Sequence, residues 1–274
     1  MLLLLLSCAG QPDDTGSSDD TSTTDTEDTG EVLPVFAGDD FALYDGTLRV
    51  FLNDENTLST DVGREQDVGK SSHWTTWADF DGDGLDDIWQ IAEGSNKALI
   101  YLNDGSVFQS EAVFDPKTGA GGKDTFSGDF NGDGKDDIAF FSGVGRLVMV
   151  PNDLGQFQWD DRVVTDYEAF EGDGAYSTMD LDGDGTDDIV HRAGSDLRIV
   201  QVLDLAPVGD LLEMHATGVV DVVGIDIDDN GFDELGLWSG STLRVHLNTN
   251  GALAEESVDI FFNKQGTPLA GQAR

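Results

Sequence analysis

The sequence of 274 residues contains little cysteine, proline or positive charge. Its single cysteine, Cys8, has no second cysteine to pair with, which excludes a fold held by intrachain disulfides. Only 14 lysine and arginine residues stand against 55 aspartate and glutamate residues, a formal net charge of −41. Binding to nucleic acid or to anionic lipid requires clustered positive charge, so we expect no nucleic-acid partner and no polybasic membrane attachment. No run approaches the ~20 apolar residues of a membrane-spanning helix, so we expect membrane attachment only through a lipid.

The first 31 residues divide into two segments that lie outside the predicted core. Residues 1–8 are a short leucine run that ends in Ser7-Cys8, and this run resembles the end of a bacterial lipoprotein signal. The resemblance implies that Cys8 is lipidated and that the protein is extracytoplasmic, at the cell envelope or secreted. The alternative is a chance leucine run with an idle cysteine. Residues 9–31 carry eight acids and no large apolar side chain, so we expect a disordered tether.

From residue 32 onward the chain repeats itself. The first aspartates of four acidic segments, Asp79, Asp129, Asp180 and Asp226, are 50, 51 and 46 residues apart. A second element, in which leucine and valine alternate with polar residues, recurs at residues 46–54, 96–104, 145–153, 195–204 and 241–249. This alternation is typical of half-buried strands. Further strand-like runs at 106–114, 156–165 and 211–217 bring the prediction to about four strands per repeat.

Repeats of this length with four strands each predict an all-β protein of the β-propeller class. A four-stranded sheet cannot cover both of its faces, so the sheets must pack around an axis. We predict about five blades over residues 32–264 and a C-terminal tail over 265–274. The first unit has only Gly38-Asp39-Asp40 in place of an acidic segment. It is predicted to be either a degenerate blade or half of a blade that the C-terminal strand completes, and a larger ring completed by another chain is the alternative to five blades.

The acidic segments follow the pattern DxDxDGxxD, which suits a calcium ion. Oxygen ligands at loop positions 1, 3, 5 and 9 and a backbone carbonyl at position 7 surround the ion, and glycine at position 6 allows the sharp turn. Magnesium is less suitable because it requires near-octahedral geometry. Four loops predict about four structural calcium ions. The predicted ligands are Asp79, Asp81, Asp83, Leu85 and Asp87 in the first loop; Asp129, Asn131, Asp133, Lys135 and Asp137 in the second; Asp180, Asp182, Asp184, Thr186 and Asp188 in the third; and Asp226, Asp228, Asn230, Phe232 and Glu234 in the fourth.

Four further acids beside these ligands receive no specific role: Asp86, Asp136, Asp187 and Asp233. The twelfth loop positions lack the glutamate of a helix-loop-helix calcium site, and the flanking residues are strand-like, so that family is disfavoured. The stretches DFDGDGLDDI (79–88) and DFNGDGKDDI (129–138) instead resemble the FG-GAP/VCBS repeat of integrin α-subunit propellers and bacterial surface proteins. The resemblance extends over residues 32–264. It implies a calcium loop between two strands of each blade and a role in recognition or adhesion.

Catalytic motifs are not found: the sequence has no GxSxG, no HExxH and no phosphate loop, and its four histidines are scattered. We therefore predict a non-catalytic propeller that recognises a protein or glycan, and the identity of that partner and the oligomeric state stay open. The alternative is an accessory or catalytic domain of a secreted polysaccharide-active enzyme. The tryptophans have two interpretations, packing between blades or a stacking platform for a ligand: Trp74, Trp77, Trp89, Trp159 and Trp238.

Overall fold

The computed structural model describes residues 39–54, 57–68, 73–92, 98–109, 112–114, 123–142, 146–153, 155–166, 174–264 and 267–271. The predicted lipidation site at Cys8, the predicted tether and residues 32–38 lie outside these ranges. The described residues belong to one compact unit and contain twenty β-strands in five four-stranded antiparallel sheets. No helix in these ranges has the length and apolar character to cross a membrane.

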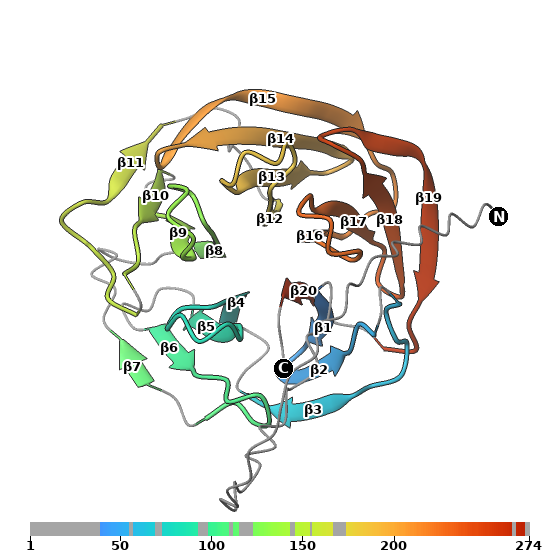
Figure 1. Cartoon of the computed structure of the whole chain (residues 1–274), viewed down its shortest axis with the longest axis horizontal. Coiled ribbons are helices and arrows are strands. Elements are labelled where there is room, and N and C mark those ends of the chain that lie inside the picture. The colour runs from blue at the N-terminus through green and yellow to red at the C-terminus, as the bar shows by residue number, and fades with distance from the viewer. Residues whose placement is uncertain are drawn as a thin grey trace, which may run out of the picture. The chain divides into compact units, whose positions relative to one another are not determined.

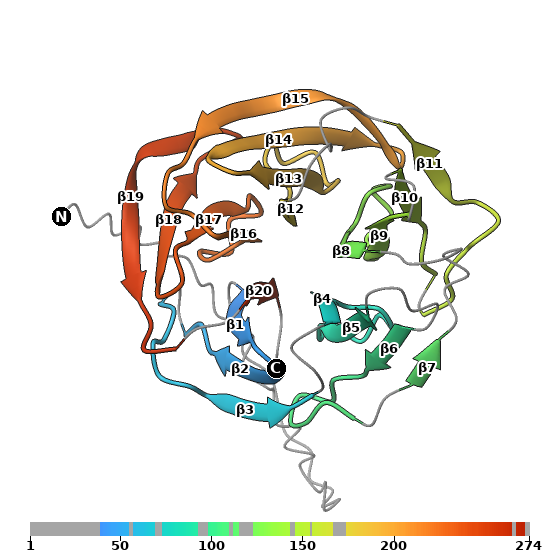
Figure 2. The ribbon, with the colours of Figure 1, turned by 180° about the vertical axis from the view of Figure 1, so that it is seen from behind.

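The five sheets form blades around a central axis (Figures 1 and 2). From the axis outward, the strands are as follows. Blade 1 contains β20 (Thr267–Gly271), β1 (Asp40–Tyr44), β2 (Thr47–Phe51) and β3 (Arg64–Asp67); blade 2 contains β4 (His73–Ala78), β5 (Asp87–Ala92), β6 (Ala98–Tyr101) and β7 (Ala112–Phe114); blade 3 contains β8 (Lys123–Gly128), β9 (Asp137–Phe141), β10 (Leu147–Val150) and β11 (Val163–Thr165); blade 4 contains β12 (Ala175–Met179), β13 (Asp188–Ala193), β14 (Asp196–Leu203) and β15 (Ala206–His215); and blade 5 contains β16 (Asp221–Ile225), β17 (Glu234–Trp238), β18 (Thr242–Asn248) and β19 (Leu253–Phe261).

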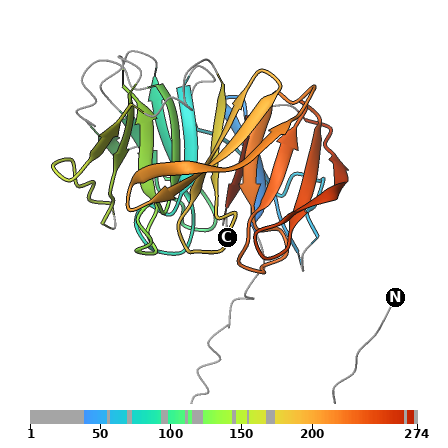
Figure 3. The ribbon, with the colours of Figure 1, turned by 90° about the horizontal axis from the view of Figure 1, so that it is seen from above.

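The position of a strand in its blade determines its burial pattern. The second strands β9 and β17 are buried at every residue, because blades pack against both of their faces. The outermost strand β15 alternates between half-buried and exposed side chains along much of its length. The hydrophobic core therefore lies between blades: Phe80 and Trp89 of blade 2 pack in one cluster with Ile138 and Phe140 of blade 3. Seen from the side, the strands run between the two ends of the ring (Figure 3).

Blade 1 combines strands from the two ends of the described sequence. Strand β20 pairs antiparallel with β1, from Asp40 opposite Gly271 to Tyr44 opposite Thr267. Of the two alternatives for the first unit, this pairing bears out completion by the C-terminal strand, although the first unit supplies three strands rather than half of the blade, and it closes a ring of five blades. The prediction of a tail that begins at residue 265 is wrong for residues 267–271. Leu269 of this strand adds to the core, where it packs in one cluster with Tyr44 and Trp77.

The tryptophans whose side chains are described belong to the core. Trp77, Trp89 and Trp238 are 6%, 1% and 1% exposed, and Trp159 packs against the cluster between blades 2 and 3. The exposures of Trp77, Trp89 and Trp238 confirm the packing interpretation for these three residues, because buried rings cannot form a platform for a ligand. The side chain of Trp74 lies outside the described part of the structure.

Candidate metal sites

The four acidic loops occupy equivalent places in blades 2 to 5. Each connects the innermost strand of its blade to the second strand: β4 to β5, β8 to β9, β12 to β13 and β16 to β17. The ninth loop residue is the first residue of the second strand, as Asp87 is of β5. All four loops therefore lie at the same end of the ring.

The first aspartate of each loop organises the backbone around itself. Oδ1 of Asp79 accepts a hydrogen bond from the amide of Gly82 (2.7 Å), and Oδ2 accepts one from the amide of Gly84 (2.8 Å). Both glycines have left-handed backbone conformations, with φ of 80° and 86°, which glycine adopts without steric cost. Asp129 and Asp180 accept equivalent bonds from the glycine amides of their loops, whereas in the fourth loop Oδ1 of Asp226 accepts from the amide of Asn230 and Oδ2 from that of Gly231. The repeated pattern thus gives four loops with the same local fold.

Three loops bring predicted ligands into close groups whose candidate ligand atoms all lie within 4.8 Å of one another. Asp83 and Asp188 are not part of these groups. The second loop has asparagine at its third position, and Nδ2 of Asn131 donates to Oδ2 of Asp137 (3.0 Å). The backbone-carbonyl ligands at Leu85, Lys135, Thr186 and Phe232 stay predictions. The three groups are Asp79, Asp81 and Asp87; Asp180, Asp182 and Asp184; and Asp226, Asp228 and Glu234.

The carboxylates at the ninth positions carry an electrostatic cost that a cation would remove. Burial, together with the neighbouring loop carboxylates, raises the pKa of Asp87, Asp137 and Glu234 to about 7 and that of Asp188 to about 8. Oδ2 of Asp87 is buried and has no hydrogen-bond partner among the described residues. A buried, unpaired carboxylate oxygen beside two other carboxylates fits a hard cation with oxygen ligands. The residues of the first loop therefore suit calcium.

The second loop differs because a lysine lies close to it. Nζ of Lys135 lies 3.5 Å from Oδ2 of the predicted ligand Asp133 and 3.0 Å from Oδ1 of Asp153. The other loops have leucine, threonine or phenylalanine at this position. The second loop thus combines a neutral asparagine with a nearby positive charge, which makes it electrostatically the least suited of the four to a divalent cation.

Asparagines at the ends of the third strands hold the loops in place, a role that the sequence interpretation missed. The amide of Asn152 donates to Oδ1 of Asp137 (2.8 Å), and its Nδ2 donates to the carbonyls of Asp136 (3.0 Å) and of Phe80 in blade 2 (3.1 Å). Asn248 makes the same set of contacts, with Leu181 as the residue in the preceding blade. The available signal was the recurrence of asparagine at positions 53, 103, 152 and 248.

Three of the four acids left without a role in the sequence, Asp136, Asp187 and Asp233, connect neighbouring blades. Each accepts a hydrogen bond from the amide of the first ligand residue in the preceding blade, and Asp39 of blade 1 does the same for blade 5. We call Asp39, Asp136, Asp187 and Asp233 the interblade carboxylates. Burial raises the pKa of Asp136 to about 7 and that of Asp187 and Asp233 well above the ordinary value. The bonds are Asp79 to Asp136 (3.0 Å), Asp129 to Asp187 (2.6 Å), Asp180 to Asp233 (2.8 Å) and Asp226 to Asp39 (3.0 Å).

The family model of the FG-GAP-like repeat matches residues 79–140. This span begins at the first loop residue of blade 2 and ends in strand β9 of blade 3. The match identifies an FG-GAP-like repeat that spans parts of blades 2 and 3 in the ring of five four-stranded blades. No curated protein matches the sequence.

Two solved structures are similar at low identity. An Agrocybe aegerita lectin, described with specific recognition of non-reducing terminal N-acetylglucosamine, shares 19% identity with a TM-score of 0.43, over 78% of this chain and 61% of its own. The V. cholerae biofilm matrix protein Bap1 shares 17% identity with a TM-score of 0.30, over 66% of this chain and 30% of its own. The chain thus spans less than two thirds of the length of either protein.

Proposed function

We propose that this propeller is a calcium-binding, non-catalytic protein that recognises a protein or glycan outside the cytoplasm. The observation that carries the calcium assignment is the group of Asp79, Asp81 and Asp87, in which one buried carboxylate oxygen has no hydrogen-bond partner among the residues that the structure describes. Similar groups in blades 4 and 5 and the equivalent loop in blade 3 extend the proposal to about four ions. When bound, calcium neutralises carboxylates that otherwise repel one another.

The proposed role of the metal is structural. If free calcium is near 1 mM and each site has a Kd of roughly 10⁻⁴ M, each ion adds about 1.4 kcal/mol to the free energy of unfolding. Four ions together add on the order of 5–6 kcal/mol, which is comparable to the net stability of a domain. The interblade carboxylates couple metal binding to the packing of the blades, because each accepts a hydrogen bond from the first residue of a metal loop in the neighbouring blade.

The FG-GAP-like repeats support the proposal that the propeller recognises a protein or glycan. Residues 9–31 are proposed to be a spacer between a lipid on Cys8 and the propeller. The described loop acids support a non-catalytic role, because the best-placed carboxylates are assigned to metal. A domain of a polysaccharide-active enzyme is the competing hypothesis, and turnover of a polysaccharide by the purified protein would establish it.

Calcium titration of metal-free protein by calorimetry tests the metal assignment. We expect about four calcium ions per chain and a large rise in melting temperature. Asp79→Asn is expected to reduce the count by one, whereas Glu255→Ala, which changes an exposed acid on β19, leaves it unchanged. A melting curve that is the same in calcium and in excess EGTA would contradict the proposal. A glycan array with and without calcium tests recognition, and mass spectrometry of the N-terminal peptide tests lipidation of Cys8.

A further inference from the structure

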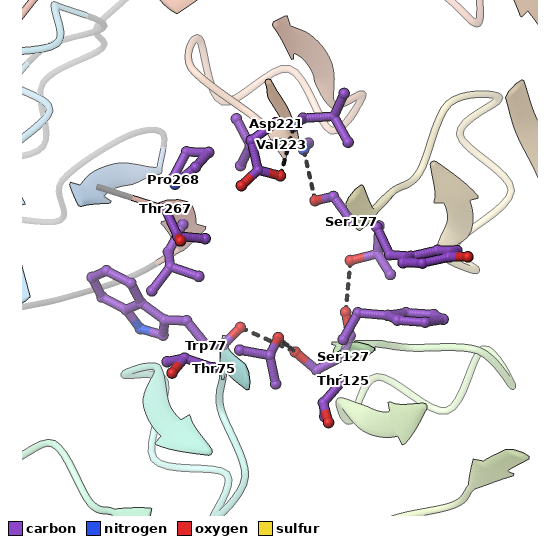
Figure 4. Close-up of a pocket in the computed structure, with 16 residues that line it drawn as sticks. Thr75, Trp77, Thr125, Ser127, Ser177, Asp221, Val223, Thr267 and Pro268 are labelled. Carbon is purple, nitrogen blue, oxygen red and sulfur yellow. Dashed lines mark hydrogen bonds between the residues drawn. The ribbon is translucent and has the colours of Figure 1, made fainter. Parts of the chain in front are cut away.

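The propeller contains a cavity on its axis, at the end of the ring opposite the metal loops. The metal loops follow the last residues of the innermost strands, whereas the cavity is lined by residues near the beginnings of these strands. Its volume is about 250 Å³, and all five blades contribute. Thr75, Thr125, Tyr176, Asp221 and Thr267 are among the residues that line it. Figure 4 shows the adjoining, narrower part of the axis, which Thr75, Thr125, Asp221 and Thr267 also border.

Hydrogen-bonded hydroxyl groups line a smaller space on the propeller axis that adjoins this cavity. Oγ1 of Thr76 and Oγ of Ser127 are 2.6 Å apart, and Oγ1 of Thr178 donates to the carbonyl of Ser127 (2.6 Å). The adjoining space, which shares part of its lining with the cavity, has a volume of about 80 Å³. That volume is sufficient for only two or three water molecules.

Charged groups of both signs line the cavity in fixed positions. The guanidinium group of Arg192 donates to the carbonyls of Gly194 (2.8 Å) and Val220 (2.9 Å), which hold it in place. The carboxylate of Asp221 accepts a hydrogen bond from the amide of Val222 (3.0 Å) and forms no ion pair within the described ranges. Both side chains line the cavity, so it presents a hydrogen-bond donor and an acceptor on adjacent blades.

Strand β8 is distorted where it lines the cavity. Asp124 has a left-handed backbone conformation with φ of 49°, and the pairing of β8 with β9 shifts between Lys123 and Phe126. Such bulges redirect side chains and are common beside functional sites. The next residue, Thr125, is 8% exposed, and its Oγ1 has no hydrogen-bond partner in the described part of the chain. A buried hydroxyl without a partner costs stability unless a ligand or water bonds to it.

We infer that this axial cavity binds a small, uncharged, polyhydroxylated molecule, such as a sugar or polyol. Threonine and tyrosine hydroxyls, two carboxylates and one guanidinium provide both donors and acceptors for neighbouring hydroxyl groups of a ligand. The carboxylates of Asp124 and Asp221 disfavour an anion, and Arg192 disfavours a cation. The volume of the cavity is below the usual range for drug-sized ligands, which favours a ligand with one sugar ring. This inference rests on the proposed recognition function and assigns it a site.

Saturation-transfer NMR on the calcium-loaded full chain tests the inference. The probes are glucose, galactose, mannose, N-acetylglucosamine and sorbitol, with glucuronic acid and glucosamine as charged counterparts. We expect at least one uncharged probe to bind more tightly than its charged counterpart. Thr125→Val is expected to weaken binding about fivefold, because it removes a hydroxyl group that can bond to the ligand. Asp221→Asn is expected to weaken binding about tenfold, because it removes the negative charge of a hydrogen-bond acceptor.

Three design features separate this result from misfolding. Thr125→Val removes a hydroxyl that has no partner, so its melting temperature should not fall. Asp221→Asn retains an oxygen for the amide of Val222. Asp259→Asn, on the outer strand β19, serves as the matched control and should bind like the unchanged protein.

The inference is overturned if no uncharged probe binds at millimolar concentration, or if glucuronic acid binds more tightly than glucose. It is also overturned if Thr125→Val and Asp221→Asn bind as well as the control, because the sugar site is then elsewhere. That last outcome leaves the proposed recognition function standing. Failure of the recognition function itself would be seen separately, as no binding of any glycan or protein with or without calcium.

Discussion

Oδ2 of Asp187 in blade 4 accepts a 2.6 Å hydrogen bond from the amide of Asp129 in blade 3, and the Asp129 carbonyl accepts a 2.7 Å bond from the Asp187 amide. Asp129 is also the first residue of the second metal loop and bonds the amides of Gly132 and Gly134. One residue thus connects the conformation of a metal loop to the packing of the next blade. Metal binding and ring stability are therefore expected to be coupled.

Asp187→Ala should reduce the free energy of unfolding by about 1–3 kcal/mol, because the amide of Asp129 loses its buried acceptor. Asp187→Asn retains a carbonyl oxygen and should cost less. Urea denaturation in calcium measures both changes, with the exposed-site variant Glu255→Ala as control. The coupling would be contradicted if Asp187→Ala were as stable as the control.

The metal-free protein should become less stable as pH rises. The raised pKa values, about 7 for Asp87, Asp137 and Glu234 and about 8 for Asp188, mean that the folded chain retains protons which the unfolded chain releases near pH 4. This contribution to stability is fully present below about pH 4, declines as pH rises, and is lost once pH passes about 7–8. Melting temperatures of dialysed protein should therefore fall between about pH 4 and about pH 8.

Calcium should reverse that trend, because it binds the deprotonated carboxylates. The calcium-induced rise in melting temperature is expected to grow between about pH 5 and about pH 8. A metal-free melting temperature that is constant or increases over the same range would show that these carboxylates do not titrate in the folded state as described.

The sequence predicts most of the fold because the signals are local. Strand alternation and the DxDxDGxxD spacing recur within each repeat, so five blades, four strands per blade and the positions of the loops follow from short stretches of chain. The pairing of Tyr44 with Thr267 does not follow, since the two residues are far apart in sequence and no local pattern connects them. The sequence therefore does not distinguish a degenerate first blade from one that the C-terminal strand completes.

The role of the interblade carboxylates likewise cannot be predicted from local sequence patterns. The paired acids at the end of each loop are visible in the sequence, and the ninth-position member is assigned as a ligand. The function of its neighbour, such as Asp136, depends on how the next blade packs against the preceding loop. Tertiary packing likewise decides which interpretation of Trp89 and Trp238 is correct, because either strand face could have been exposed.

Arg64 should stabilise the ring independently of calcium. Its guanidinium group donates to Oδ1 of Asn103 in blade 2 (3.3 Å) and lies 4.4 Å from the centre of the Phe108 ring. Blade 1 has no metal loop in the described ranges. The guanidinium group of Arg64 instead connects blade 1 to blade 2. Arg64→Ala should cost about 1–2 kcal/mol through lost packing and bonding. Urea denaturation should give the same loss in calcium and in EGTA, whereas a loss confined to calcium would contradict this role.

Lys135→Thr should raise the calcium affinity of the second loop. The substitution introduces the residue found at the same position of the third loop and removes a positive charge 3.5 Å from Asp133. The interaction is exposed to solvent, so we expect a gain of up to about fivefold that decreases with added salt. Calcium titration of the variant measures this gain, and Lys264→Thr, remote from the loops, is the control. Unchanged affinity at low salt would indicate that the lysine does not compete with the ion.

Removal of β20 should open the ring. A chain that ends at Lys264 lacks the strand that pairs with β1, so β1 presents an unpaired edge at the axis and Leu269 no longer contributes to the core. We expect the shortened protein to melt more than about 10 °C lower or to aggregate. A chain that lacks only residues 272–274 should melt like the full-length protein, because β20 ends at Gly271. A peptide of residues 265–274, added in trans, should restore part of the lost stability. If the chain that ends at Lys264 melted like the full-length protein, closure of blade 1 by β20 would not be required for stability.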